Sequence, residues 1–157
     1  MSEKKRVLMV CLGNICRSPI AEAVFRNEMN KRGLQHQWEV DSAALIGYHT
    51  GKIPDNRALS TLKENGITNY SHRARQIEQT DFDKYDWIFG MDHENIKNLK
   101  QLKPKNSQAK VELLGSYNSS GDPIIRDPYY DYNSVGFQRV YEQCLASVTA
   151  FLNKYSS

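Results

Sequence analysis

The amino-acid sequence predicts an α/β fold, with a doubly wound parallel sheet of about four strands and helices on both faces. Short apolar runs typical of buried parallel strands alternate along the chain with stretches of helical apolar periodicity. The first run leads directly into a loop and a helix start, as in a strand–loop–helix unit. The 157 residues suit one hydrophobic core, and we expect a single domain over residues 1–157.

The first strand and the first helix flank a short loop. The apolar run Val7–Val10 predicts the strand, and Ser18 followed by Pro19 predicts an N-cap and the first helical position. The helix is predicted to end before Gly33, after basic residues that suit a helix C-terminus. Its apolar stripe consists of Ala21, Val24, Phe25 and Met29.

The same alternation continues through the middle of the chain. Residues 38–44 predict a second strand, and a helix with Ala58, Leu59 and Leu62 on its apolar face follows and ends at Asn65-Gly66. Residues 85–91 predict a third strand, and Asp92 is the expected N-cap of a helix that reaches Leu102. Residues 111–114 predict a fourth strand.

The last third of the chain combines a long loop with a long helix. Residues 116–132 are rich in Gly, Asp, Pro, Ser and Tyr, and a loop of this length in a compact domain is usually functional. Apolar residues at helical spacing from Phe137 to Leu152 predict the final helix. Cys144 belongs to that stripe and is expected in the core.

Charge and cysteine content exclude several classes of protein. The net charge is only +3 and the basic residues are scattered without interleaved aromatics, so we expect no nucleic-acid partner. Three cysteines, a polar start at Met1–Lys4 and the lack of an 18-residue apolar run predict a reduced, cytoplasmic protein without a membrane segment. Cys11-x4-Cys16 is not the thioredoxin Cys-x-x-Cys spacing, and no second cysteine pair or clustered His completes a zinc set, so we expect no metal.

The loop Cys11-Leu12-Gly13-Asn14-Ile15-Cys16-Arg17-Ser18 carries the strongest functional signal. A loop between a strand and a helix directs backbone N–H groups at one point, where a tetrahedral oxyanion binds. The same donors and Arg17 would favour the thiolate of Cys11, which is a nucleophile. The planar guanidinium of Arg17 can hold two phosphate oxygens. A nearby Cys16 suggests a reversible disulfide with Cys11 after oxidation.

Thiolate attack on a phosphate monoester also requires a general acid for the leaving oxygen. The long loop offers Asp122, Asp127 and Asp131. Asp127 is favoured, because Pro128 makes it extended and the two tyrosines that follow supply apolar surface. Asp122 remains an alternative, and both Asp-Pro pairs are also common in ordinary turns.

Four segments together resemble the low-molecular-weight protein tyrosine phosphatases, also called acid phosphatases, in order and over essentially the whole chain. They are Cys11–Ser18, His72–Ile77, Met91-Asp92 and Asp127–Tyr130. The resemblance implies hydrolysis of phosphotyrosine and other aryl phosphates through a phosphocysteine, with no cofactor. It assigns Cys11 as nucleophile, Arg17 as phosphate clamp and Asp127 as acid and then base. It also implies that a hydrogen-bond network shapes the loop, formed by Asn14, Ser18, Ser42 and His72.

The resemblance is weaker at the expected mouth of the pocket. Tyr48 replaces a commoner tryptophan, and Arg126 stands where an acidic residue is frequent. We expect these positions to line the mouth, and we expect four rings to form an aromatic wall that selects aryl phosphates. These rings belong to Tyr48, His49, Tyr129 and Tyr130. The remaining substrate contacts are expected from the loop residues Leu12, Gly13, Asn14, Ile15, Cys16 and Ser18.

Two other functions use similar elements. An arsenate reductase needs a resolving cysteine pair in mid-chain, but the sequence has no cysteine between Arg17 and Gln143. A phosphopeptide-binding module would need neither a nucleophile nor an acid. We therefore expect a phosphatase that acts on phosphotyrosine proteins or small aryl phosphates, as a monomer or weak dimer.

Overall fold

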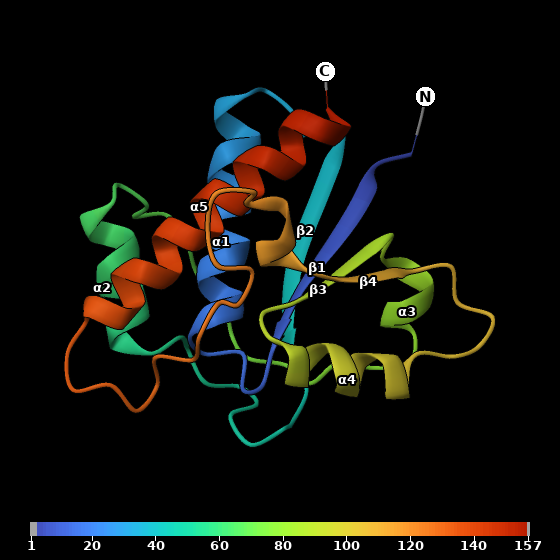
Figure 1. The fold of residues 1–157 in the computed structure, drawn as a ribbon, viewed down its shortest axis with the longest axis horizontal. Helices are drawn as coiled ribbons and strands as arrows, with labels where there is room; N and C mark the ends of the chain where they lie inside the picture. The colour runs from blue at the N-terminus through green and yellow to red at the C-terminus, as the bar shows by residue number, and fades with distance from the viewer. Residues whose placement is uncertain (1–2, 157) are drawn as a thin grey trace.

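The computed structural model describes residues 3–156, so the first two residues of the polar start at Met1–Lys4 lie outside the described part. Four parallel strands form one sheet in the order β2-β1-β3-β4 (Figure 1). They are β1 (Lys5–Cys11), β2 (Trp38–Ala44), β3 (Trp87–Gly90) and β4 (Lys110–Leu113). The predicted fold class is confirmed.

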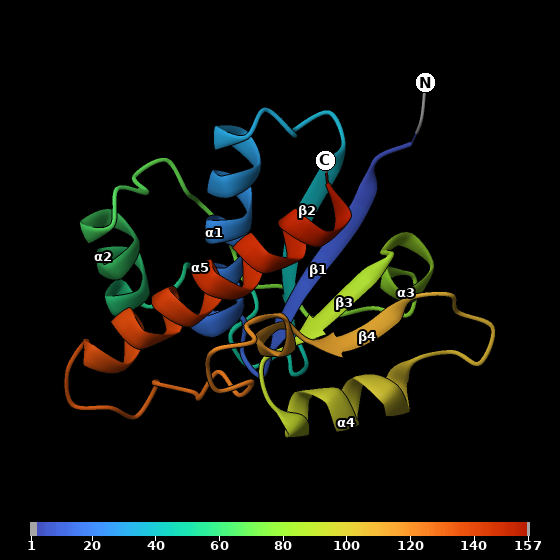
Figure 2. The same cartoon turned by 45° about the horizontal axis from the view of Figure 1, so that its top comes forward.

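Helices cover both faces of this sheet, as Figure 2 shows. On one face α1 (Arg17–Lys31) and α5 (Val135–Tyr155) pack together, and α2 (Asn56–Glu64) packs against both of them. On the other face lie α3 (Asp81–Lys84) and α4 (His93–Leu102). A short 3₁₀ helix, η1 (Leu114–Tyr117), follows β4 and leads into the long loop before α5.

The central strand β1 explains why its sequence is a continuous apolar run. Residues 7–10 are all fully buried, because successive side chains point to opposite faces of the sheet and each face is covered by a hydrophobic cluster. Val7 and Met9 pack with α1 and α5, whereas Leu8 and Val10 pack with residues of α3 and α4. Cys11 ends this strand beside Ala44 of β2, so its thiol lies at the carboxyl edge of the sheet.

Several details differ from the sequence-based prediction, among them β1 and β4, which span Lys5–Cys11 and Lys110–Leu113 rather than residues 7–10 and 111–114. Helix α1 begins at Arg17, its N-cap is Cys16, and Ser18 lies inside the first turn rather than capping it. The Ser18 hydroxyl contacts the Cys11 thiol instead, so a tertiary partner replaces the expected cap. β3 spans Trp87–Gly90 rather than residues 85–91, and the sequence analysis missed the short helix α3 that precedes it.

Other boundaries follow the local sequence signals. β2 has the predicted bounds, α2 ends at Glu64 with Asn65 of the predicted Asn65-Gly66 stop as its C-cap, and Asp92 caps α4 by accepting a hydrogen bond from the Asn95 N–H. Cys144 is fully buried in the core, as expected. Among residues 3–156, no helix combines the length and apolar character needed to cross a membrane.

Candidate active site

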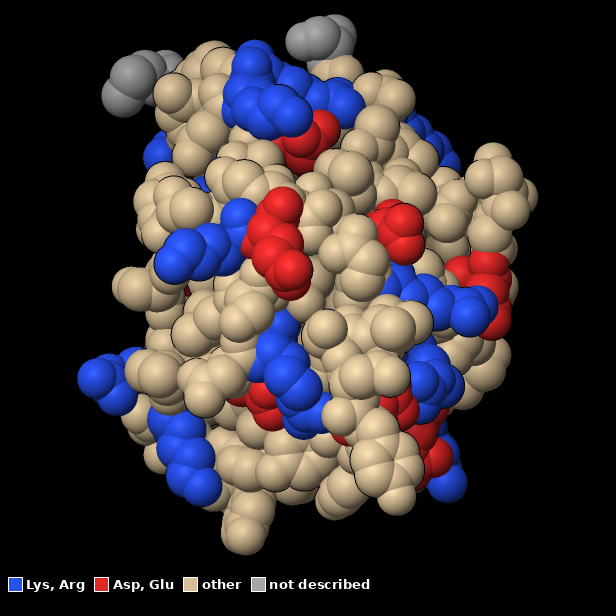
Figure 3. Space-filling view, turned by 90° about the vertical axis from the view of Figure 1, so that its left-hand side faces the viewer, with Lys and Arg blue, Asp and Glu red and all other residues tan. Residues whose placement is uncertain are grey.

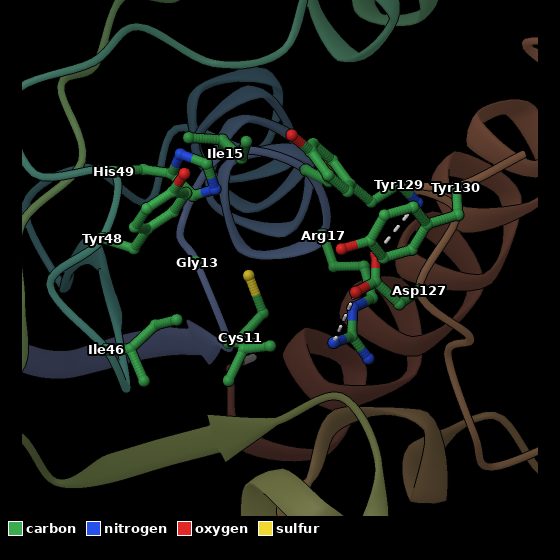
Figure 4. Close-up of a pocket in the computed structure, with 12 residues that line it drawn as sticks. Cys11, Gly13, Ile15, Arg17, Ile46, Tyr48, His49, Asp127, Tyr129 and Tyr130 are labelled. Atoms are coloured by element: carbon green, nitrogen blue, oxygen red, sulfur yellow. Dashed lines mark hydrogen bonds and ion pairs between the residues drawn. The ribbon is translucent and has the colours of Figure 1, made fainter.

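The loop between β1 and α1 surrounds the Cys11 sulfur with hydrogen-bond donors. The N–H of Asn14 lies 3.3 Å from Sγ, and the N–H of Ser18 lies 3.4 Å from it. The Ser18 hydroxyl is 3.0 Å from the same sulfur. Hydrogen bonds to the charged form of a group favour that form, so this arrangement suits a thiolate. Figure 4 shows the sulfur at the base of a cavity.

Asn14 gives the loop its shape. Its backbone has φ of 59°, the left-handed region that asparagine tolerates better than most residues. Its buried side-chain amide donates to Ser18 Oγ at 2.8 Å and to Ser42 Oγ at 3.0 Å. The amide oxygen accepts from His72 Nε2 at 2.8 Å and from the Arg75 N–H at 3.2 Å. These four bonds hold a backbone conformation that would otherwise be costly.

A second layer of polar residues lies behind Asn14. Ser42 Oγ donates to Glu22 Oε1 at 2.6 Å, and the Tyr70 hydroxyl donates to the same oxygen at 2.9 Å. His72 Nε2 is 3.2 Å from Ser42 Oγ, and His72 Nδ1 is 3.5 Å from Glu22 Oε1. The predicted network of Asn14, Ser18, Ser42 and His72 is therefore assembled in the structure. Glu22 and Tyr70 extend it.

Burial sets the ionisation of this second layer. It raises the pKa of Glu22, against the hydrogen bond from Ser42, and it lowers the pKa of His72. Glu22, Asp41 and His72 place potential metal-ligand atoms within 4.8 Å of one another. Glu22 Oε1 and His72 Nε2 already take part in the hydrogen-bond network, which accounts for this grouping.

Arg17 is buried at the first position of α1, with its guanidinium held from two sides. Its Nη1 donates to Asp92 Oδ2 at 2.6 Å and to the carbonyl of Ile125 at 3.0 Å. Its Nη2 lies 3.7 Å from Asp127 Oδ2. The buried Nε finds no hydrogen-bond partner among residues 3–156. Asp92 thus both caps α4 and orients Arg17.

The structure distinguishes the three candidate acids by their positions. Asp127 lines the cavity, and Figure 4 shows its carboxylate beside Arg17. The exposed Asp122 accepts a hydrogen bond from the Ile124 N–H. Asp131 pairs with Arg126 at 2.7 Å and does not line the cavity. Of the three carboxylates, only that of Asp127 faces the space above Cys11.

The cavity above the thiol has a volume of about 310 Å³. Tyr48 and His49 lie on one side of Cys11 in Figure 4, and Tyr129 and Tyr130 lie on the other. Neighbouring rings make contact, with centroid distances of 4.8 Å (Tyr48–His49), 6.0 Å (His49–Tyr129) and 4.9 Å (Tyr129–Tyr130). The lining residues are Cys11, Leu12, Gly13, Ile15, Cys16, Arg17, Ile46, Tyr48, His49, Asp127, Tyr129 and Tyr130.

Most of the predicted substrate-binding residues meet in this cavity. Asn14 and Ser18 are fully buried beneath it and do not line it. Arg126 was expected at the mouth, but it does not line the cavity, because its side chain turns to Asp131. Ile46 was missed, although it lies in the same loop as Tyr48. Glu22 was missed because a glutamate inside a helix usually lies on its exposed face and is rarely buried without a partner.

A parallel α/β sheet whose central strand ends in a cysteine within an anion-binding loop, facing an arginine and an aspartate, defines the class of cysteine-dependent phosphatases. The comparisons with known proteins agree with this class. Residues 6–156 match the family described as Low molecular weight phosphotyrosine protein phosphatase. The chain belongs to this family.

Individual relatives cover nearly the whole chain. The Homo sapiens low molecular weight phosphotyrosine protein phosphatase is 50% identical over 152 residues, which are 96% of this chain and 95% of the human protein. The crystal structure of Primo-1 superposes with a TM-score of 0.93 at 44% identity, covering 98% of this chain and 99% of Primo-1. A Drosophila arginine phosphatase, DARP, gives a TM-score of 0.89 at 41% identity, covering 96% and 98%.

Proposed function

We propose that the chain hydrolyses phosphotyrosine and other aryl phosphate monoesters through a phosphocysteine intermediate, without a metal. One observation carries the proposal: the Cys11 sulfur receives three hydrogen-bond donors at the base of a cavity that Arg17 and Asp127 also line. Nucleophile, anion-binding group and proton donor therefore share one small space. Family membership supports the same reaction.

In the first step, Cys11 Sγ attacks phosphorus as a thiolate and forms the S–P bond. The P–O bond to the aryl group breaks, and Asp127 gives its proton to the leaving phenolate oxygen. The guanidinium of Arg17, including its buried Nε, and the loop N–H groups bind the non-bridging oxygens, whose charge increases in the transition state. Asp92 fixes the guanidinium plane throughout.

In the second step, a water molecule attacks phosphorus and the S–P bond breaks. The Asp127 carboxylate takes the proton from this water, which restores the acid for the next turnover. The Cys11 thiolate leaves and is stabilised again by the Ser18 hydroxyl and the two N–H groups. The products are inorganic phosphate and the phenol.

The walls of the cavity support an aromatic substrate. Leu12 and Ile46 are each about two-fifths exposed at its rim, and Ile15 lines its wall between the two pairs of rings. A phenyl ring entering between Tyr48 and Tyr130 would bury apolar surface and make edge or stacking contacts. A long aliphatic side chain would gain less from the same walls.

Phosphoarginine is a second candidate substrate, because one similar structure is titled an arginine phosphatase. A guanidinium leaving group would need polar acceptors, and the lining offers Asp127 and His49 among mainly apolar groups. We therefore place phosphotyrosine first. Competition between a phosphotyrosine peptide and a phosphoarginine peptide of the same sequence would rank them directly.

Phosphate release from 4-nitrophenyl phosphate in the presence of EDTA tests the reaction. We expect turnover in the unmodified chain and a loss of several orders of magnitude in Cys11→Ser, with vanadate binding retained. Acid quenching with a ³²P-labelled aryl phosphate should trap a labelled protein only when Cys11 is present. Near-normal turnover of Cys11→Ser would refute the mechanism.

The same proposal includes four broader properties. Cys11 and Cys16 line one cavity as free thiols, which supports a reversible disulfide after oxidation. A thiolate nucleophile requires a reducing compartment, which supports a cytoplasmic location. On the face in Figure 3 acidic and basic side chains are interspersed, which argues against a nucleic-acid surface. We also propose a single domain that is a monomer or weak dimer.

A further inference from the structure

The segment that carries Asp127 packs on the core through Pro128 and Tyr129 but has few hydrogen bonds to the rest of the protein. We call residues 126–132 the acid loop. Within it, Asp127 Oδ1 accepts from the Tyr129 N–H at 3.1 Å, and the Asp131 N–H donates to the Pro128 carbonyl at 3.0 Å. Arg126 pairs with Asp131 in the same loop. These bonds shape the acid loop, but they do not fix where it lies.

Arg57 of α2 supplies the missing connection. Its Nη2 donates to the carbonyl of Tyr129 at 2.8 Å, and its Nη1 donates to the carbonyl of Asp131 at 2.9 Å. Within residues 3–156, these two are the only hydrogen bonds between the acid loop and any other segment. The other polar contact is the 3.7 Å ion pair of Asp127 with Arg17, which a bound phosphate would compete for.

Arg57 is itself held rigidly on its other side. Its Nε and Nη2 donate to the two carboxylate oxygens of Asp55, each at 3.0 Å. Burial alone would raise the pKa of Asp55, but the hydrogen bonds from Arg57 outweigh it and lower this pKa. The guanidinium also lies 4.5 Å above the ring of the fully buried Phe137. A planar guanidinium fixed in this way can direct its remaining donors at two carbonyls.

Asp55 connects this arrangement to the loop that binds phosphate. Its backbone N–H donates to the carbonyl of Ile15 at 2.8 Å. Its carboxylate also caps α2 by accepting from the Arg57 N–H at 2.9 Å. A continuous path of short contacts therefore runs from Ile15 through Asp55 and Arg57 to the acid loop. The loop that carries Cys11 and the acid loop are therefore both hydrogen-bonded to the Asp55–Arg57 pair.

We infer that Arg57 is a positioning residue that holds Asp127 within reach of the leaving oxygen by joining the acid loop to the phosphate-binding loop. It does not line the cavity and is not a catalytic residue. The inference rests on the proposed function, because it assigns Asp127 the acid role. It predicts that loss of Arg57 impairs proton donation more than thiolate attack.

The first test uses Arg57→Met and Arg57→Lys. Methionine keeps an apolar contact with Phe137 but donates no hydrogen bond. Lysine keeps the charge beside Asp55 but cannot reproduce a planar fork on two carbonyls. Arg139→Met is the matched control, because Arg139 is exposed on α5 and outside the acid loop. Thermal unfolding shows whether each variant is folded.

The measurement is kcat/KM for aryl phosphates whose leaving phenols range from acidic 4-nitrophenol to basic phenol. For Arg57→Met we expect a loss within about threefold for 4-nitrophenyl phosphate and about hundredfold for phenyl phosphate, because an acid displaced by about 1 Å matters most for a basic leaving group. Arg57→Lys should recover only part of the phenyl phosphate activity. Arg139→Met should match the unmodified chain.

A second measurement does not depend on turnover. Amide hydrogen exchange should accelerate about tenfold or more in residues 127–132 of Arg57→Met, and remain unchanged in β1 and α1. Equal losses across the substrate series, or unchanged exchange in the acid loop, would overturn the positioning role. Full recovery by Arg57→Lys would also overturn it, because charge alone would then suffice. No turnover by the unmodified chain would instead refute the proposed function, and the exchange measurement would still decide the role of Arg57.

Discussion

Replacing Asn14 by alanine should damage both stability and activity, by an amount that the structure allows us to work out. The change leaves the part-buried Arg75 N–H without its acceptor, and we take the lower end of the cost of an unsatisfied donor, about 1 kcal/mol. His72 Nε2, Ser18 and Ser42 each keep another partner. Alanine at φ of 59° adds about 1 kcal/mol, for a total near 2 kcal/mol.

Asn14→Gly is the matched comparison, because glycine also removes the four side-chain bonds but tolerates the left-handed backbone. The free energy of unfolding of Asn14→Gly should be about 1 kcal/mol higher than that of Asn14→Ala, as measured by urea unfolding followed by circular dichroism. Both variants should lose about tenfold or more in kcat for 4-nitrophenyl phosphate, because the Ser18 hydroxyl at Cys11 loses its support. A loss below about 1 kcal/mol in Asn14→Ala, or full activity in Asn14→Gly, would show that the network does not shape the loop.

Three further predictions concern the acid, the second thiol and the rim. Asp127→Asn should slow the hydrolysis of phenyl phosphate far more than that of 4-nitrophenyl phosphate, as measured by stopped flow. Equal losses for both substrates would show that another group is the general acid. Burial raises the pKa of the Cys16 thiol, so little thiolate exists at neutral pH. After peroxide treatment, the Cys11–Cys16 disulfide should therefore form faster as pH rises from 6 to 8, by about tenfold per unit, which mass spectrometry after thiol trapping measures. If Cys16→Ser regains activity with dithiothreitol as fully as the unmodified chain, Cys16 does not protect Cys11. Tyr130→Ala should lower the preference for phosphotyrosine over phosphoserine peptides by about two- to tenfold in kcat/KM, and an unchanged ratio would exclude selection by this ring.

Local sequence chemistry predicted most of the fold. The bounds of β2, the C-cap of α2 at Asn65 and the Asp92 cap all depend on residues within a few positions of one another. The prediction was wrong at the start of α1. Serine is a common N-cap residue, but the Ser18 hydroxyl contacts the Cys11 sulfur and Cys16 is the N-cap. The competing partner comes from the end of β1, and a capping preference worth about 1 kcal/mol is easily outweighed.

The sequence alone determined the alternation of strands and helices, and the spacing of Cys11 and Arg17 around one strand-to-helix loop, because both features lie within short windows. It favoured Asp127 over Asp122 and Asp131 through the Pro-Tyr-Tyr that follows Asp127, but it could not show which carboxylate lies beside Cys11. That position depends on contacts between distant segments, such as Arg57 with Tyr129, which is 72 residues further along the chain. Burial of Glu22 and the tethering of the acid loop by Arg57 were likewise decided only on folding, because the partner of a polar side chain depends on which segments pack together.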